Sequence, residues 1–115
     1  MILTAIILGA AVIAGVGIVA AFWNDILKFL KAAIEKVKSF IQGIVYGTKV
    51  FIQKMSEAFK EISRHYSKVD DQWEETIVTK IVSESEVPEE IRKKAERSSR
   101  EVDITEELEL QLQNA

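Results

Sequence analysis

Residues 2–23 of this 115-residue chain read ILTAIILGAAVIAGVGIVAAFW, and this stretch governs how the remainder is interpreted. It contains no Asp, Glu, Lys, Arg, His, Asn or Gln. A helix of this length extends about 33 Å at 1.5 Å per residue, enough to cross a hydrocarbon core of roughly 30 Å. A buried helix of a small soluble domain normally has a polar stripe, and this stretch has none. The sequence therefore predicts a transmembrane helix over residues 1–23.

Two other interpretations of this N-terminal stretch stay open. A cleavable signal peptide fits the small residues Ala20 and Ala21, although residues 2–8 lack the positive charge with which a signal peptide begins. A hydrophobic helix buried in a soluble oligomer fits the unbroken apolar run. The first of these would leave a secreted mature protein that begins near Trp23.

Small residues recur at three- and four-residue steps along the predicted span. This spacing lets helix backbones approach closely in lipid, where packing replaces the hydrophobic effect. Ala and Gly are also simply common in membrane helices, which is the alternative explanation. We expect a homo-oligomer in which the helix-packing residues in the membrane are Ala10, Ala14, Gly17 and Ala21.

The charged residues separate into a basic part and an acidic part. Seven lysines against four acidic residues give net +3 up to Ile62, and eight basic against fourteen acidic residues give net −6 from Ser63 onward. A basic segment beside the span is typical of contact with anionic lipid, and the positive-inside rule then places the N-terminus outside and the C-terminal region in the cytoplasm. The residues expected to contact lipid headgroups are Trp23, Lys28, Lys31, Lys36 and Lys38.

Residues 24–62 have the periodicity of one long amphipathic helix. Apolar residues step by three and four, and polar residues repeat every seven on the opposite side. The apolar stripe is wide, so it must bury against the membrane interface, the same helix of other subunits, or the C-terminal part of this chain. The apolar face comprises Leu30, Ile34, Val37, Ile41, Ile44, Phe51, Met55 and Ile62.

The period changes after residue 62. Residues 73–82 alternate and are rich in β-branched side chains, and Asp70 and Asp71 form a turn-prone centre before them. This pattern predicts a β-hairpin over residues 63–83. An isolated hairpin is only marginally stable in water, so it needs a helix face or another sheet to pack against.

The remaining residues, 84–115, form a charged tail in which two short helices are expected. Pro88 followed by Glu89 and Glu90 is a typical helix start, because the acidic residues meet the positive end of the helix dipole. Residues 103–113 begin with a capping box, although their alternating leucines also fit a strand.

The sequence contains no recognisable pattern for catalysis, metal or cofactor binding. One histidine, His65, and no cysteine cannot build a zinc site, and the acidic residues near Pro88 lack the spacing of a calcium loop. Basic residues between 92 and 100 have acidic neighbours on the same helix face, which argues against binding to nucleic acid. Phosphate-loop and hydrolase motifs do not occur. We therefore expect a non-enzymatic protein with no cofactor, no metal and no catalytic residue.

These patterns predict a mainly α membrane protein, in which one N-terminal transmembrane helix runs into a long amphipathic helix, followed by a small β-hairpin and short C-terminal helices. Its segments are residues 1–23, 24–62, 63–83 and 84–115. The expected function is a single-pass, membrane-anchored assembly or adaptor module that self-associates through its helices. The expected partners are the lipid bilayer, other copies of the chain and a protein partner for the distal module. A membrane-perturbing effector, holin-like or pore-forming, is the alternative from another class, and a secreted protein is the third.

Overall fold

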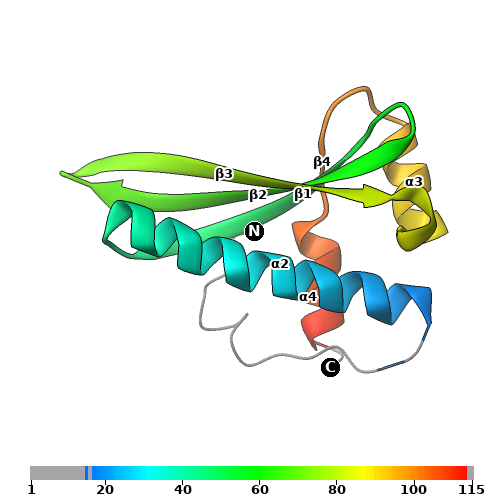
Figure 1. Cartoon of the computed structure of the whole chain (residues 1–115), viewed down its shortest axis with the longest axis horizontal. Helices are drawn as coiled ribbons and strands as arrows, with labels where there is room; N and C mark the ends of the chain where they lie inside the picture. The colour runs from blue at the N-terminus through cyan, green and yellow to red at the C-terminus, as the bar shows by residue number, and fades with distance from the viewer. Residues whose placement is uncertain (1–14, 16, 114–115) are drawn as a thin grey trace.

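The computed structural model describes residue 15 and residues 17–113. They form an α+β domain, in which an antiparallel sheet has the strand order β3-β2-β1-β4 and the long helix α2 lies along one of its faces (Figure 1). The elements in chain order are α2 (Ile18–Ile41), β1 (Val45–Lys54), β2 (Ala58–Val69), β3 (Gln72–Ser83), the 3-10 helix η1 (Glu84–Glu86), α3 (Glu89–Glu96), β4 (Val102–Asp103) and α4 (Thr105–Gln113).

Helix α2 is amphipathic, and its apolar stripe faces the sheet. Its buried side chains follow the three- and four-residue steps of one helix face, and Ile26 and Leu30 are completely enclosed. The helix ends at Ile41, because Gln42 takes the left-handed conformation with φ 51° that commonly closes a helix. The sequence left three surfaces open for this stripe. In the structure the stripe packs against the C-terminal part of the same chain.

Within residues 17–113, one hydrophobic core joins the sheet to the helices α2, α3 and α4. Figure 1 shows α2 beneath the strands, with α3 at one end of the sheet and α4 crossing α2 in this view. The core residues that follow α2 in the chain include Val50, Ile52, Phe59, Val82, Ile91, Ala95, Ile104 and Leu108. The distal part of the chain therefore completes the core that α2 begins.

The strands β2 and β3 form the longest antiparallel pair. They join at Asp70 and Asp71, whose φ values of 51° and 64° are those of a two-residue hairpin turn with both central residues left-handed. This is the turn expected from the sequence. However, β2 begins at Ala58, before the expected 63–83, and both strands belong to a larger sheet.

Residues 45–62 were expected to continue the amphipathic helix, and that prediction is wrong. They form β1 and the beginning of β2, and the alternate residues Thr48, Val50 and Ile52 are fully buried. Burial at every second residue is the period of a strand. The many β-branched and aromatic side chains after Gly43 favour this outcome over a helix.

The predicted membrane fold is also wrong. Among residues 17–113, no helix is long and apolar enough to cross a membrane. This finding overturns the mainly α, single-pass fold and the integral-membrane location with an outside N-terminus and a cytoplasmic C-terminal region. Phe22 and Trp23, expected at the end of the span, are buried in the core, with their ring centroids 4.9 Å apart. Residues 1–14 of the predicted span, which include Ala10 and Ala14, lie outside the described residues.

Candidate interaction surface

The strand β3 lies at one edge of the sheet, where its outer backbone groups have no strand neighbour among residues 17–113. It pairs with β2 along its whole length without a register shift, so no bulge bends this edge away. The unpaired N–H and C=O groups of such an edge can accept another strand. We call this side of β3 the free edge.

Side chains of β3 alternate between two surfaces of the sheet. Val82 faces α2 and is buried, whereas Trp73, Ile77 and Ile81 point to the opposite side. On that side Trp73 is 65 % exposed, Ile77 49 % and Ile81 58 %. We call this surface the open face. Three large apolar side chains on one strand, each about half exposed or more, are typical of a surface that contacts a partner.

A pair of aromatic rings marks one end of the open face. Tyr46 lies at a bulge in β1, where the pairing with β2 shifts between Val45 and Gly47. Its ring packs edge-on against Trp73, with centroids 5.6 Å apart, and Lys68 places its amine 5.9 Å from the Trp73 ring centre. The indole is therefore supported from two strands while most of its surface stays exposed.

An ion-pair cluster holds the middle of the open face. The guanidinium of Arg64 binds Glu75 at 2.9 Å, binds Glu101 from the loop before β4, and lies 5.3 Å from the ring centre of Phe51. Burial lowers the pKa of Arg64, but the hydrogen bonds and charges of the two carboxylates outweigh it and raise that pKa above its ordinary value. Ile62, which pairs with Phe51 across β1 and β2, is also buried. The large apolar side chains most exposed on this face therefore lie on β3.

The opposite face of β2 carries a row of buried polar side chains under α2. His65 is fully enclosed, with Nδ1 2.9 Å from the Thr48 hydroxyl and Nε2 2.8 Å from the Ser63 hydroxyl. Because Ser63 donates its proton to the carbonyl of Val78, its oxygen accepts from Nε2–H of His65. Burial lowers the pKa of His65 to about 4 and so favours the neutral ring, in which Nδ1 accepts from the Thr48 hydroxyl.

This row resembles the hydroxyl and base of a nucleophilic enzyme, but its burial gives it a different role. Thr48, Ser63 and His65 are each 0 % exposed, so no substrate reaches them in this structure. At the end of the row, Glu61 is 1 % exposed, and one of its carboxylate oxygens has no hydrogen-bond partner within the described chain. Burial is the main cause that raises the pKa of Glu61 to about 7. We assign these residues to stability and its pH dependence.

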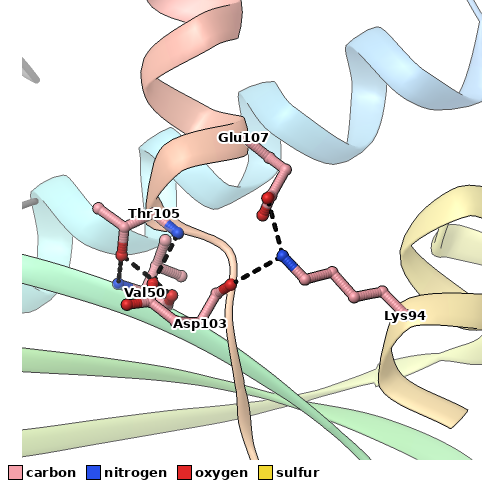
Figure 2. Close-up of polar contacts among 5 residues, drawn as sticks. All are labelled: Val50, Lys94, Asp103, Thr105 and Glu107. Atoms are coloured by element: carbon pink, nitrogen blue, oxygen red, sulfur yellow. Dashed lines mark hydrogen bonds and ion pairs between the residues drawn. The ribbon is translucent and has the colours of Figure 1, made fainter. Parts of the chain in front are cut away.

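A groove of about 870 Å³ lies between the start of α2 and the helices α3 and α4. Figure 2 shows Lys94 reaching from α3 to two groups: its amine lies 2.8 Å from a carboxylate oxygen of Glu107 and 3.2 Å from the carbonyl of Asp103. Lys93 on the same wall pairs with Glu89 at 3.2 Å. Since these charges neutralise one another, the groove offers little net charge to a ligand. Residues 17–113 also hold no group of three or more potential metal ligands.

The residues expected on the apolar helix face do not form one surface. Leu30, Ile34 and Val37 lie on α2 and are buried, and Ile41 ends that helix half-buried. The other four lie beyond α2, with Ile44 exposed before β1, Phe51 half-buried on β1, Met55 exposed after β1 and Ile62 buried on β2. The first group serves the core and the second is dispersed over the sheet.

The residues expected to contact headgroups or pack helices all lie at or on α2, except those outside the described residues. Of the residues expected at the headgroups, Trp23 is buried, Lys28 and Lys36 are exposed, and Lys31 and Lys38 are half-buried. Of the residues expected to pack helices, Gly17 precedes α2 with φ 93° and Ala21 is exposed in its first turn. None of them contributes to the open face. The alternation of isoleucines in residues 73–82 was the sequence signal for that face, but it did not show which side would be covered.

Comparisons with protein-family models, with curated proteins and with solved structures find no match. Function is therefore inferred from the surface of this chain alone.

Proposed function

We propose that this chain is a non-catalytic protein-interaction domain, and that its binding surface combines the open face and the free edge of β3. The observation that carries the proposal is the exposure of Trp73, Ile77 and Ile81 along a strand whose outer edge is unpaired. Apolar side chains and unpaired backbone groups on one strand are the two features used when a partner adds a strand to a sheet.

This binding surface on β3 differs from the apolar stripe of residues 24–62 through which the sequence predicts self-association. Self-association through the apolar stripe of residues 24–62 needs that stripe to be free, and so does the membrane-perturbing alternative. Leu30, Ile34 and Val37 are instead enclosed between α2 and the sheet. Binding through β3 leaves this core intact, because the strand already exposes its own apolar side chains.

Position-specific photo-crosslinking tests the proposal. A photoreactive phenylalanine analogue replaces Thr79, which lies on the open face between Ile77 and Ile81, in the full-length chain produced in its own cells. The matched control places the analogue at Lys36, an exposed position on α2. We expect an adduct from position 79 and not from position 36, and its loss when Trp73→Ser and Ile81→Ser are added. Equal adducts at both positions, or none at position 79, would contradict the proposal.

A further inference from the structure

The free edge lacks most of the features that usually prevent strands from pairing between molecules. Natural edge strands are kept apart by proline, by bulges, by short length or by charged side chains, and of these β3 has only the charges of Glu74, Glu75 and Lys80. β3 runs from Gln72 to Ser83 without proline and pairs with β2 without a bulge. The middle of the strand, from Thr76 to Thr79, carries no charge. Its edge is therefore suited to accept another strand.

We infer that the partner of this edge is β3 of a second copy of the same chain, paired antiparallel with Ile77 opposite Ile77. This inference rests on the proposed function, since it names the occupant of the same surface. Two copies related by a two-fold axis through this point would extend the sheet across both molecules. The open faces of the two copies would then lie on the same side.

Geometry restricts the registers that such a pair can adopt. When a two-fold axis relates two antiparallel strands side by side, the open faces of both copies lie on the same side of the sheet. Residues directly opposite each other point to the same side, so each residue must lie opposite a residue of the same face. The axis therefore passes midway between one residue and the same residue of the second copy. Every register is then defined by the residue that lies opposite itself.

The register centred on Ile77 is complementary on both faces of the sheet. On the open face it places Trp73 opposite Ile81 of the second copy, so that the apolar side chains meet one another. On the other face it places Glu74 opposite Lys80 of the second copy. Neither Glu74 nor Lys80 forms an ion pair within 4.0 Å among residues 17–113. The charge of Lys80 also acts on the buried Glu61, which lies opposite it on β2.

The two neighbouring registers lack this complementarity. Centring the pair on Thr76 places Glu75 opposite Ile77, and centring it on Val78 places Glu75 opposite Ile81. In both cases a carboxylate that Arg64 holds on the open face would meet an isoleucine. Of these three registers, the strand sequence favours the one centred on Ile77.

The absence of cysteine from the sequence allows a direct test by disulfide trapping. Residues directly opposite in an antiparallel pair have Cβ atoms about 4.5–5.5 Å apart, close to the span of a disulfide. In the full-length protein under mild oxidation, we expect Ile77→Cys to give a covalent dimer. Glu75→Cys and Thr79→Cys should each remain monomeric alone and form a mixed dimer when combined, because the register places these two positions opposite each other.

A charge variant provides an independent measurement. Glu74→Lys places lysine opposite Lys80 at two symmetry-related points, so we expect the dimer dissociation constant from analytical ultracentrifugation to rise roughly tenfold. Glu106→Lys, which makes the same charge change at an exposed position on α4, should leave it unchanged. Circular dichroism of each variant confirms that the fold is retained.

The outcomes separate this inference from the proposed function. A monomeric wild-type protein, or equal trapping of the single variants at positions 75, 77 and 79, would overturn the self-pairing. If position 79 then gives a photo-adduct with the mass of a different protein, the proposed function holds and the second copy is excluded. If position 79 gives no adduct and the protein is monomeric, both fail.

Discussion

Glu61 and His65 lie on the same buried face of β2, and burial shifts their pKa values in opposite directions. The pKa of Glu61 rises to about 7 because of burial, which Lys80 on β3 opposes and Asp25 on α2 and Glu86 on η1 reinforce. Burial lowers the pKa of His65 to about 4. At mildly acidic pH both side chains therefore favour their neutral forms, which suits two groups enclosed beneath a helix.

These two shifts have opposite effects on stability. The folded chain keeps a proton on Glu61 that the unfolded chain releases above its ordinary pKa of 4.5, so this contribution is complete below pH 4.5 and is lost as the pH rises toward 7. The unfolded chain protonates His65 below its ordinary pKa of 6.5, so that contribution is complete above pH 6.5 and is lost as the pH falls toward 4. Between pH 4.5 and 6.5 the two dependences oppose each other.

Single variants should reveal the two dependences separately. In Glu61→Gln, of these two groups only His65 still titrates. The free energy of unfolding should then fall by roughly 1 kcal/mol as the pH drops from about 6 to 5. In His65→Gln only Glu61 remains, and the free energy should fall by a similar amount as the pH rises over the same range. Urea unfolding at several pH values measures both. Parallel pH profiles for the two variants would contradict the burial of one group or the other.

Truncation of α2 tests whether its apolar stripe is core. Leu30 is fully buried, so Leu30→Ala should lower the free energy of unfolding by about 2–5 kcal/mol. Phe40 on the same helix is 82 % exposed, and Phe40→Ala should change it by no more than about 0.5 kcal/mol. Chemical denaturation of both variants gives the comparison. A larger loss from Phe40→Ala than from Leu30→Ala would mean that α2 packs through a different face.

One buried hydroxyl contributes to the attachment of α4 to the sheet. The Thr105 hydroxyl accepts from the Val50 N–H at 3.0 Å and donates to the Val50 carbonyl at 3.3 Å (Figure 2). Thr105→Val leaves the Val50 N–H unpaired, while the Val50 carbonyl keeps its hydrogen bond from the Ile104 N–H at 3.0 Å, and should cost about 1–3 kcal/mol. Lys94→Met, which breaks a partly exposed ion pair with Glu107, should cost less than about 1 kcal/mol. Hydrogen exchange at Val50 should accelerate only in the Thr105 variant, and equal acceleration in both would refute this difference.

Some elements were predictable because their signals are local. The turn at Asp70 and Asp71 follows from residues that tolerate positive φ, and α3 begins after Pro88 with acidic residues in its first turn. The stripe of α2 was also visible in the spacing of its apolar residues. The candidate surface was only partly predictable, because the alternation of residues 73–82 shows two faces without showing which one a helix covers.

The sequence by itself determined the helix period of α2, the hairpin turn and the start of α3, since each depends on residues within a few positions of one another. Only the tertiary structure decided that residues 45–62 are strands, that His65 is buried and that Trp73 is exposed. Apolar spacing over a short run fits a helix or a strand, and pairing partners distant in the chain decide between them. β1 illustrates this dependence, because it is fixed by β2 on one side and, through Val50 and Thr105, by the C-terminal segment on the other.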